Sequence, residues 1–599
     1  MRTHTCNQLR PDHNGDTVTL IGWVNSARDH GGVIFIDLRD REGLTQCVFR
    51  PEQSADAARL SHSLRAEDVI RVTGTVEPRP EIDGKSTVNA DLPTGGIEVA
   101  ASELKILNKA EVLPFQLEKE LSNEDLRLSH RYLDLRRPRL ARNLRTRHLV
   151  TKAARDFLDS QGFIEVETPI LSKSTPEGAR DFLVPSRMQP GSFYALPQAP
   201  QQYKQLLMVA GVEKYFQVAR CFRDEDLRAD RQPEFTQVDI EASFTDPDQI
   251  IGLIEGCLAA MFQSARSLEI PTPFERMTWH EAMDRFGSDK PDRRFAIEIT
   301  DVSNLFAESG FKVFSGAIQN GGVVKAINAK GFAGITTGQV DKLTEIAVNA
   351  GAKGLAYIQV RGDDPATWRS PITKFFNESE LAGLKEALLI EEGDLILFAA
   401  DQWQPACEIL GRIRLECACM QGLLEGQEDV FDFLWVTEFP LLAHDEEEGR
   451  WVAVHHPFTR PVDEDRPKLE AGDYAGLRAQ AYDVVLNGHE LGGGSIRIHE
   501  ADLQAAMFNA LGISENDARA EFGHILDAFQ FGAPPHGGIA LGLDRIVMLI
   551  AGEQSIREVI AFPKNNKGAD LMTSSPAPAT PIQLRDLRIK STVPEDKEP

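Results

Sequence analysis

Five short stretches near the N-terminus alternate between apolar, often β-branched, residues and polar residues with a period of two, which is typical of half-buried β-strands. A stretch without glycine or proline at residues 54–64 lies between the third and the fourth of them and favours a helix. We therefore predict a β-barrel over residues 18–107, built from five strands with a helix after the third. The predicted strands are residues 18–26, 33–40, 44–49, 69–77 and 96–107.

This order of elements is that of the oligonucleotide-binding (OB) barrel, whose second and third strands present aromatic side chains to unstacked bases. On that face we expect Phe35 and Gln46, with Arg28 in the preceding turn. Taken alone, Phe35 is more typical of a core position in an alternating strand. A barrel by itself does not establish nucleic-acid binding.

Helical spacing follows the barrel. Residues 108–138 are charged and contain Pro114, which predicts a hinge between domains. Apolar residues then recur at helical spacing over residues 140–160. This basic region can hold an RNA backbone or can be an ordinary solvated helix face, and the pattern leaves both open. The arginines around its start are Arg137, Arg139, Arg142, Arg145 and Arg147.

Three further segments place charged residues and glycines on predicted strands. Residues 162–171 leave the helix for a strand that ends at Pro169. Residues 216–225 and 234–241 are typical of two antiparallel strands, joined by a charged loop. Residues 537–545 form a glycine-bearing strand that runs into an apolar helix.

Composition narrows the class of protein. The chain has 599 residues, about four domains of roughly 150 residues each. Its 65 Lys and Arg against 91 Asp and Glu give a net charge of −26, which excludes a uniformly basic surface that wraps nucleic acid. No apolar run approaches the roughly 18 residues of a membrane span, and the polar N-terminus does not resemble a secretory signal.

We therefore expect a cytoplasmic protein without a membrane segment. The seven cysteines contain no CxxC pair, so we interpret them as reduced thiols, with a zinc site as the less favoured alternative.

The three segments at residues 162–171, 216–241 and 537–545, in this order, resemble the three motifs of class II aminoacyl-tRNA synthetases. One of them alone would be weak evidence, but the coincidence of three is specific. Further blocks are similar to bacterial-type aspartyl-tRNA synthetases, and the resemblance covers all but about the last 35 residues. These blocks are residues 175–182, 221–234, 455–459 and 492–497.

The resemblance implies an α+β multidomain fold. Its parts are an OB-fold anticodon-binding domain at 1–107, a hinge at 108–138, an antiparallel-sheet catalytic domain split into 139–288 and 431–563, an inserted α/β domain at 289–430 and a C-terminal extension at 564–599. The insert shows strand and helix signals but no chemical constellation. Residues 574–599 are rich in proline, serine, threonine and charge, so we expect them to be largely disordered.

The implied reaction is that of a ligase, namely activation of L-aspartate by ATP and transfer to the 3′ end of tRNA-Asp. An ionised carboxylate that attacks the α-phosphate needs no protein base, so catalysis consists of positioning and of stabilising phosphate charge. The resemblance assigns catalytic roles to Arg223 at the α-phosphate and to Arg545 at the γ-phosphate. The implied ATP-binding residues are Arg223, Asp224, Glu225, Gln232, Glu490, Gly542, Leu543, Asp544 and Arg545.

The resemblance further implies Mg²⁺ at Asp483 and Glu490, since Mg²⁺ prefers one or two carboxylates plus phosphate oxygens. Taken alone, either residue would be an ordinary surface acid. For the amino acid, Arg497 and Lys204 match the side-chain carboxylate and Glu177 matches the ammonium group. The implied aspartate-binding residues are Glu177, Gln201, Lys204, Arg223, Asp239, His455 and Arg497.

Two details of the pocket stand beside this assignment. Ala199 occupies a position where family members often carry serine, and we expect an effect on substrate affinity and not on identity. The adjacent His455 and His456 are also compatible with a capped turn.

A single residue of the first domain bears on tRNA choice. Family members restricted to tRNA-Asp often have leucine at the position of His30, whereas members that also charge tRNA-Asn often have histidine. We therefore expect charging of tRNA-Asn as well, followed by an amidotransferase, with strict tRNA-Asp specificity as the alternative. A second position falls near Gly84, where residues 81–88 do not align cleanly. The implied anticodon and discrimination residues are Arg28, His30, Phe35, Gln46 and Gly84.

The chain retains features that other classes of function would not require, and these features disfavour those classes. A paralogue that makes asparagine or another adenylate product would be expected to lose the barrel, and a non-catalytic RNA-binding module would be free to lose Arg223, Glu225 and Arg545. A lysine- or asparagine-specific relative would lack Arg497 in its glycine-rich setting. The resemblance also implies a homodimer built around Pro169.

Overall fold

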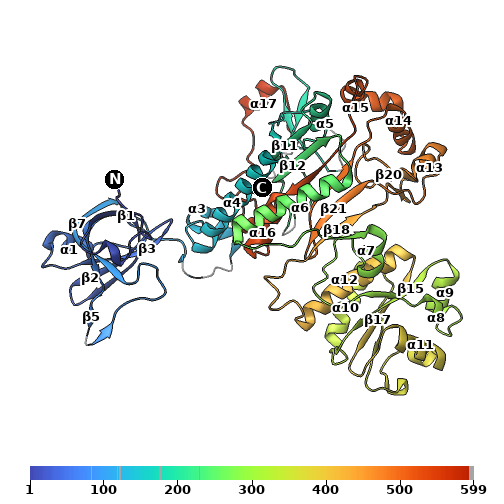
Figure 1. Ribbon diagram of the computed structural model, residues 1–599, viewed down its shortest axis with the longest axis horizontal. Helices are drawn as coiled ribbons and strands as arrows, with labels where there is room; N and C mark the ends of the chain where they lie inside the picture. Colours follow the sequence, from blue (N-terminus) through green and yellow to red (C-terminus); the bar gives the residue numbers. More distant parts are fainter. Residues whose placement is uncertain (83, 118, 120–122, 175–178, 228–229, 593–599) are drawn as a thin grey trace. The chain divides into compact units, whose positions relative to one another are not determined.

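The computed structural model describes the chain except residues 83, 118, 120–122, 175–178, 228–229 and 593–599 (Figure 1). The chain divides into two compact units. One comprises Met1–Arg127 and Tyr132–Ala141, and the other comprises Leu128–Arg131 and Arg142–Pro599.

The first unit contains a closed barrel in the strand order β1-β2-β3-β7-β4. Helix α1 (Ala55–Ser61) follows β3 and is capped by the Ser54 side chain. The prediction of an OB barrel is therefore confirmed. A small hairpin of β5 (Glu81–Ile82) and β6 (Lys85–Ser86) was not predicted. The barrel strands are β1 (Thr17–His30), β2 (Val33–Asp40), β3 (Gly43–Phe49), β4 (Val69–Pro78) and β7 (Ile97–Asn108).

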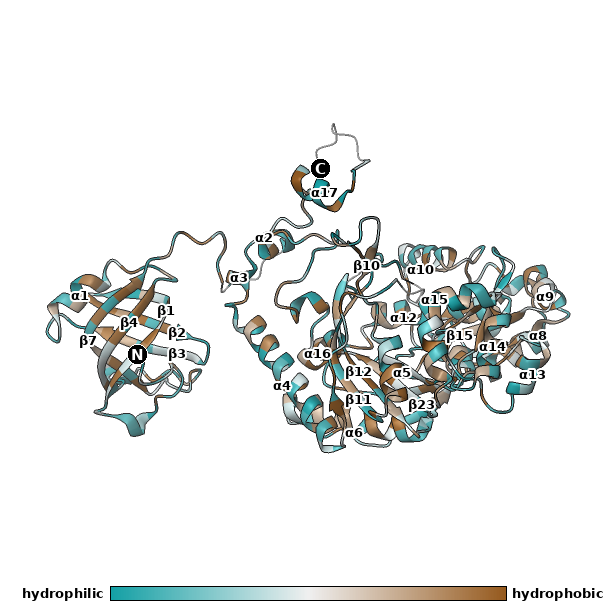
Figure 2. Cartoon of the chain, turned by 90° about the horizontal axis from the view of Figure 1, so that it is seen from above, coloured by the Kyte–Doolittle hydropathy of each residue, from teal (hydrophilic) through white to brown (hydrophobic). Residues whose placement is uncertain are grey.

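The alternation along β2 decides between the two interpretations of Phe35. Ile34, Ile36 and Leu38 are buried in the barrel core, whereas Phe35 is only partly buried and lies outside that core. Because successive side chains of a strand point to opposite faces, Phe35 belongs to the outer face. Figure 2 shows the hydrophobic residues carried by the barrel strands.

The segment expected to be a hinge contains helices α2 (Glu124–Ser129) and α3 (Arg131–Asp134), and α4 (Pro138–Ser160) follows. Of the arginines at the start of α4, Arg147 forms an ion pair with Asp544 and Arg137 is buried near Asp134. Those two arginines therefore have internal partners and are not part of a solvated helix face.

The second unit is organised around an eight-stranded sheet in the order β13-β18-β21-β22-β23-β12-β11-β8. Its pairs are antiparallel except β13–β18 and β11–β8. The strand expected at residues 162–171 is reduced to the two residues of β8. The strands are β8 (Ile164–Glu165), β11 (Lys214–Phe222), β12 (Glu234–Ser243), β13 (Glu275–Thr278), β18 (Phe433–Thr437), β21 (Ala481–Leu486), β22 (His489–Ile496) and β23 (His536–Gly542).

One face of this sheet is the main core of the unit. Val238 and Ile240 of β12 pack there with Ile254 and Leu258 of α6 and with Val547 of α16. The alternate residues of β12 consequently face the opposite side. Between residues 200 and 551 the helices outside the insert are α5 (Gln201–Val209), α6 (Pro247–Arg266), α7 (Trp279–Phe286), α13 (Arg466–Ala471), α14 (Ala501–Ala510), α15 (Glu515–Phe529) and α16 (Leu543–Ala551).

The inserted segment builds a second sheet, in the order β14-β15-β17-β16, whose pairs are all antiparallel. Its strands are β14 (Ile299–Asp301), β15 (Val323–Ala329), β16 (Ala356–Gln359) and β17 (Leu395–Asp401). Its helices are α8 (Ser303–Phe306), α9 (Lys312–Gln319), α10 (Thr337–Asn349), α11 (Glu378–Ala387) and α12 (Trp403–Gln421). Arg414 of α12 is buried and donates hydrogen bonds to the carbonyl oxygens of Ile297 and Asp292, which ties the start of the insert to its last helix.

Short elements complete the chain. Residues 574–599, which we expect to be largely disordered, include the short helix α17 (Pro581–Leu587), which begins at a capping box of Thr580 and Gln583 and buries none of its residues. Two further hairpins pair β9 (Leu183–Pro185) with β10 (Phe193–Ala195) and β19 (Leu442–Asp445) with β20 (Arg450–Ala453). The 3₁₀ turns are η1 (Pro11–His13), η2 (Pro365–Thr367), η3 (Thr373–Phe375) and η4 (Ile556–Glu558). No helix among the described residues has the length and hydrophobicity to cross a membrane.

Glycines allow β22 to approach its neighbours closely. A Cβ atom on Gly494 would lie 2.2 Å from the carbonyl oxygen of Gly538 and 2.8 Å from the Tyr482 ring. A Cβ atom on Gly492 would lie 2.3 Å from the carbonyl oxygen of Ala540. The spacing of these central strands therefore requires glycine.

We predict that Gly494→Ala lowers the thermal unfolding midpoint by several degrees, because the added methyl group overpacks the sheet at a cost of about 1–3 kcal/mol. Gly523→Ala is the matched control, since Gly523 lies inside helix α15 with no atom within 4 Å of the added Cβ. Alanine is the better helix former, so the control should raise the midpoint or leave it unchanged. Equal effects of the two substitutions, measured by calorimetry, would contradict the packing argument.

Candidate active site

Strand β12 presents Gln237, Asp239 and Glu241 on the face opposite the core. Gln237 and Asp239 line a cavity of about 440 Å³, and Glu241 is fully buried behind it. Lys204 reaches the same cavity from α5, and Arg497 reaches it from the end of β22. The cavity thus collects charged groups from three elements that lie far apart in the sequence.

Two cations and two acids form a buried network in this cavity. The Lys204 ammonium lies 2.7 Å from Asp239 and 3.1 Å from Glu241. The Arg497 guanidinium forms two parallel hydrogen bonds to the Glu241 carboxylate, of 2.9 and 3.1 Å. Burial alone would raise the pKa of Glu241, but Arg497 and Lys204 outweigh it and lower the pKa to about 2. Glu241 is therefore a permanent anion that holds both cations.

The remaining edge of Arg497 is fixed as well. Its Nη1 donates to Ser495 Oγ at 2.6 Å and to His456 Nε2 at 2.7 Å. Burial and the nearby Arg497 charge hold the pKa of His456 well below its usual value. A neutral imidazole accepts this hydrogen bond, so His456 orients Arg497 without repelling it.

Asp239 retains an acceptor for a ligand. Its Oδ1 accepts from Lys204, whereas its Oδ2 is buried without a hydrogen-bond partner. Burial and the Glu241 charge outweigh Lys204 and raise the pKa of Asp239. A positively charged donor placed at Oδ2 would supply the missing hydrogen bond and stabilise the ionised carboxylate, as expected of a carboxylate that binds an ammonium group.

A second cavity of about 220 Å³ adjoins the first. Both are lined by Arg223, Gln237, Glu490 and Ala540. The Arg223 guanidinium lies over the Phe235 ring, 5.2 Å from its centroid, and its Nε atom is buried without a partner. Arg223 therefore stands between the two cavities with hydrogen-bonding capacity to spare.

Arg545, on α16, lines the second cavity. It donates to the Glu490 carbonyl oxygen and lies 3.3 Å from Asp230, and its Nε atom is also buried without a partner. Two arginines with unused donors in one glycine-walled cavity suit an anion with several oxygens, such as a phosphate chain. Gly542 lines the same cavity.

Of the residues expected to contact ATP, Asp544, Leu543 and Gln232 occupy three different environments. Asp544 is buried and accepts from Arg147 and from the Thr236 amide, so it braces the wall of the cavity. Leu543 is a core residue. Gln232 lines the cavity while its carboxamide is held at both ends by the Lys564 backbone, with hydrogen bonds of 2.8 and 3.1 Å.

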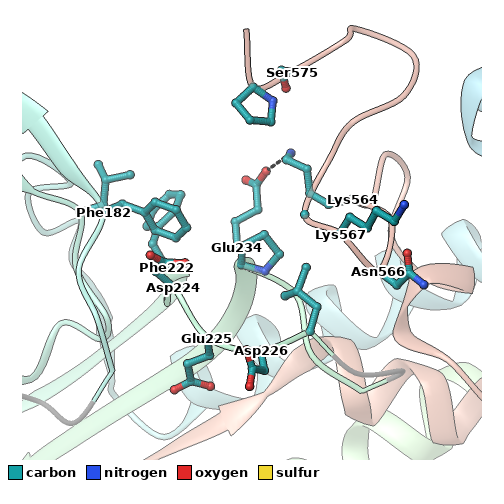
Figure 3. A pocket seen from close by; sticks show the side chains of 15 residues that line it. Phe182, Phe222, Asp224, Glu225, Asp226, Glu234, Lys564, Asn566, Lys567 and Ser575 are labelled. Carbon is teal, nitrogen blue, oxygen red and sulfur yellow. Dashed lines mark hydrogen bonds and ion pairs between the residues drawn. The ribbon is translucent and has the colours of Figure 1, made fainter. Parts of the chain in front are cut away.

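A third cavity, of about 550 Å³, lies between the end of β11 and the segment that follows α16 (Figure 3). Asp224 lines this cavity and not the second one, whereas Glu225 lines both. Lys564 lines this cavity and forms a 2.7 Å ion pair with Glu234 (Figure 3). Asp224 therefore shares a cavity with Glu225 but not with Arg223, Gln232 and Arg545.

The expected metal ligands fit a cation. Asp483 and Glu490 both line the first cavity, and Asp483 Oδ1 is buried without a hydrogen-bond partner, 4.0 Å from His455 Nε2. Burial raises the pKa of Asp483 to about 6, more than His455 lowers it, and a nearby cation would favour the charged form. Among the described residues no group of three or more metal-ligating side chains occurs. Two carboxylates completed by phosphate oxygens suit Mg²⁺.

The predicted tRNA-binding residues lie on the barrel. The Arg28 guanidinium lies 3.0 Å from the Asp37 carboxylate and donates to the Gln46 side-chain oxygen at 3.3 Å. Arg28 and Gln46 therefore share the outer face with Phe35. The His30 ring meets the Phe35 ring edge to face, with centroids 5.6 Å apart. Gly84 is in the turn of the β5–β6 hairpin with a φ of 72°.

Of the residues predicted to bind aspartate, Glu177 lies outside the described residues. The first cavity is lined by all the others, namely Gln201, Lys204, Arg223, Asp239, His455 and Arg497. Sequence reasoning missed the groups that orient these side chains. Glu241 could have been found, because it follows Asp239 by two residues on the same strand face. The other missed residues are His456, Ser495, Trp279 and Asp289.

Comparison with known proteins identifies the family. The family described as tRNA synthetases class II (D, K and N) matches residues 123–566, and the OB-fold nucleic acid binding domain matches residues 18–107. The chain belongs to the class II tRNA synthetases, a family of ligases.

Similar proteins extend over the full length. An Opitutus terrae protein called Aspartate--tRNA(Asp/Asn) ligase is 55% identical over 99% of this chain and 100% of its own. A Geobacillus kaustophilus protein called Aspartate--tRNA ligase is 52% identical over 100% of both chains. In fold, the chain is similar to the crystal structure of a putative aspartyl-tRNA synthetase from Leishmania major Friedlin, with a TM-score of 0.59, 20% identity and coverage of 94% of this chain and 93% of that one.

We predict that Glu241→Gln destabilises the second unit by about 3–5 kcal/mol near neutral pH, because it leaves two buried cations with one acid. The pKa of Glu241 is lowered from 4.5 to about 2 on folding. The contribution of the ionised Glu241 to the free energy of unfolding is therefore complete above about pH 4.5 and is lost as the pH falls toward 2. Denaturant midpoints of both proteins should differ by a constant amount from pH 7 to pH 5 and converge below. A difference that grew on acidification would contradict the network.

Proposed function

We propose that this protein is an aspartate–tRNA ligase, which activates L-aspartate with ATP and transfers the aspartyl group to the 3′ end of tRNA-Asp. The observation that carries the proposal is the buried pair of cations, Arg497 and Lys204, in a cavity that is joined through Arg223 to a second, arginine-lined cavity. A small dicarboxylate and a nucleotide triphosphate match these two cavities in charge.

In this proposal Arg497 and Lys204 bind the side-chain carboxylate of aspartate. Asp239 Oδ2, which is buried without a partner, accepts from the ammonium group together with Glu177. Arg223 binds the α-carboxylate at the junction of the cavities. Gln201 and His455 complete the walls of the pocket.

The same geometry would reject asparagine. A carboxamide placed against Arg497 would direct hydrogen atoms at a guanidinium that has no acceptor to offer them. Buried charged groups left unpaired cost far more than a lost methyl contact. Discrimination then needs no editing step.

The first step would be attack of the α-carboxylate oxygen on the α-phosphorus of ATP. A bond from this oxygen to phosphorus forms, the bond to the β-phosphate oxygen breaks, and diphosphate leaves. No proton is transferred in this step, so it needs arginines that stabilise negative charge and does not need a general base. Arg223 at the α-phosphate and Arg545 at the γ-phosphate stabilise the charge that develops.

Glu225, Gln232, Gly542 and Arg545 would line the nucleotide site, with Asp544 bracing it. Asp483 and Glu490 would hold Mg²⁺, which supplies charge neutralisation to the phosphates. In the second step the terminal ribose hydroxyl of the tRNA attacks the aspartyl carbonyl carbon, the bond from this carbon to the phosphate oxygen breaks, and AMP leaves with the hydroxyl proton on its phosphate.

We further propose that both tRNA-Asp and tRNA-Asn are substrates, with the barrel face of Arg28, Phe35 and Gln46 as the anticodon surface. His30 beside Phe35 supports this assignment, as does the Asp/Asn name of the Opitutus terrae relative. Aspartyl-tRNA-Asn would then be the substrate of an amidotransferase.

The dimer and the location are part of the same proposal. Ile164, Ile170 and Leu171, around Pro169, are 56%, 39% and 52% exposed, which supports a homodimer interface there. All seven cysteines are free, which supports a reducing, cytoplasmic location.

The amino-acid assignment is tested by aspartate-dependent exchange of diphosphate into ATP. We expect exchange with aspartate and none with asparagine. Arg497→Lys should lower kcat/KM for aspartate roughly 10- to 150-fold, because lysine keeps the charge but loses the fork to Glu241 and Ser495. Arg519→Lys, which changes an arginine half-exposed on α15, is the control and should match the unchanged enzyme. Exchange with asparagine alone would overturn the proposal.

The tRNA assignment is tested by aspartylation of tRNA-Asp and tRNA-Asn transcripts. We expect comparable kcat/KM values for the two, and a loss of at least about tenfold for tRNA-Asn alone in His30→Leu, that is ~1.4 kcal/mol. His4→Leu, which changes another histidine of the barrel unit, should alter neither value. A preference of several hundredfold for tRNA-Asp, roughly 3.5 kcal/mol, would refute charging of tRNA-Asn.

A further inference from the structure

Helix α7 joins the proposed aspartate cavity to the insert. Trp279, its first residue, lines the cavity, and so does Asp289, which follows the helix. Phe286 at its other end lies beneath the Arg414 guanidinium of α12, 5.1 Å from the ring centroid. One short helix thus contacts both the substrate site and a part of the chain to which sequence assigns no chemistry.

Asp284, in the middle of α7, is bound by two elements of the insert. Its Oδ1 accepts from the Lys325 ammonium of β15 at 2.6 Å and from the Trp403 indole of α12 at 2.9 Å. The Lys325 side chain is fully buried, and its other acid, Asp301, is 3.9 Å away. Lys325 therefore depends on Asp284 for its closest counter-charge.

The Asp284 carboxylate is charged in this setting. Burial would raise its pKa, but the hydrogen bonds from Lys325 and Trp403 and the Lys325 charge outweigh burial and lower the pKa. Asp284 itself is partly exposed, but its ion pair with the buried Lys325 ammonium and the additional hydrogen bond from the Trp403 indole fix the direction of its carboxylate, which suits a fixed contact better than a sliding one.

Packing around the ion pair leaves α7 little freedom. His280 stacks on the Trp403 ring, with centroids 4.5 Å apart and planes 14° from parallel. Gly287, which ends α7 with a φ of 67°, faces Gly411 of α12 so closely that a Cβ on Gly411 would lie 2.3 Å from its carbonyl oxygen. A shift of α7 would break the ion pair, the ring stack and the backbone contact together.

The two cavity-lining residues flank this joint, Trp279 on one side of Asp284 and Asp289 on the other. They share the cavity wall with His455, Asp483 and Arg497. We propose that Asp284 is a positioning residue, and that the insert, by gripping it through Lys325 and Trp403, holds Trp279 and Asp289 in place and so sets the affinity for the amino acid. This inference rests on the proposed function, because it takes aspartate as the ligand of the cavity.

The test compares the full-length enzyme with Asp284→Asn and with the double variant Asp284→Asn/Lys325→Met. Asparagine keeps the shape and an acceptor for Trp403 but removes the charge. The double variant replaces the ion pair without leaving a buried charge, so it is expected to fold. We expect KM for aspartate to rise roughly three- to thirtyfold in both variants, with KM for ATP and kcat within twofold.

Lys342→Met is the matched control. Lys342 forms a 2.6 Å ion pair with Glu416, and both residues lie within the insert, in α10 and α12. Loss of this pair changes the charge of the insert without touching Asp284, so KM for aspartate should be unchanged. An equal rise of KM in the control would overturn the specific role of Asp284.

Hydrogen–deuterium exchange over residues 279–289 supplies a readout that needs no substrate. The double variant should exchange faster there, whereas β21 and β22 should keep the rate of the unchanged enzyme. A folded double variant with unchanged exchange and unchanged KM for aspartate would overturn the inference, as would a uniform fall in kcat at constant KM. Failure of the proposed function would appear separately, as absence of aspartate activation in the unsubstituted enzyme.

Discussion

The site depends on the interaction of the Glu241 carboxylate with two buried cations. Four charged side chains share one small volume, and each cation would be costly to bury without its acid. Glu241 satisfies two of them at once, since it accepts both arms of Arg497 and lies 3.1 Å from Lys204. With those contacts made, the carboxylates and arginines nearer the cavity keep free atoms for a ligand. Asp239 and Arg223 are examples, each with a buried polar atom that has no partner.

The sheet makes this network possible. Because β12 sends Val238 and Ile240 into the core, Gln237, Asp239 and Glu241 must face the other side. The glycines of β22 then let that strand lie against β23 without side chains in between, which brings Arg497 within reach of Glu241. The alternation of side chains along β12 and the glycines of β22 thus place the charged residues of the site together.

Much of this could be predicted from local patterns. The alternation in residues 33–40 identified a barrel strand, and the strand-and-glycine segments at 216–241 and 537–545 identified the central sheet. Patterns of this kind depend on neighbouring residues and are visible along the chain. The roles of Glu241 and His456 were missed because each acts on Arg497, a contact between distant residues that no periodicity encodes. Helix α17 was missed because composition outweighed the Thr580–Gln583 capping box.

Strands β13 and β18 are parallel neighbours at the edge of the central sheet, and the insert leaves the sheet after the first and returns at the second. Arg293 closes the two ends of the excursion, since it pairs with Asp432 at 2.7 Å and with Glu275 at 2.6 Å. Because both ends of the insert meet at adjacent strands, its deletion would leave the order of the strands in the sheet unchanged. Deletion would nevertheless remove Lys325 and Trp403, which bind Asp284 of α7. Continuity of the sheet and integrity of the cavity wall at Trp279 and Asp289 are therefore separate requirements, and only the first can be met without the insert.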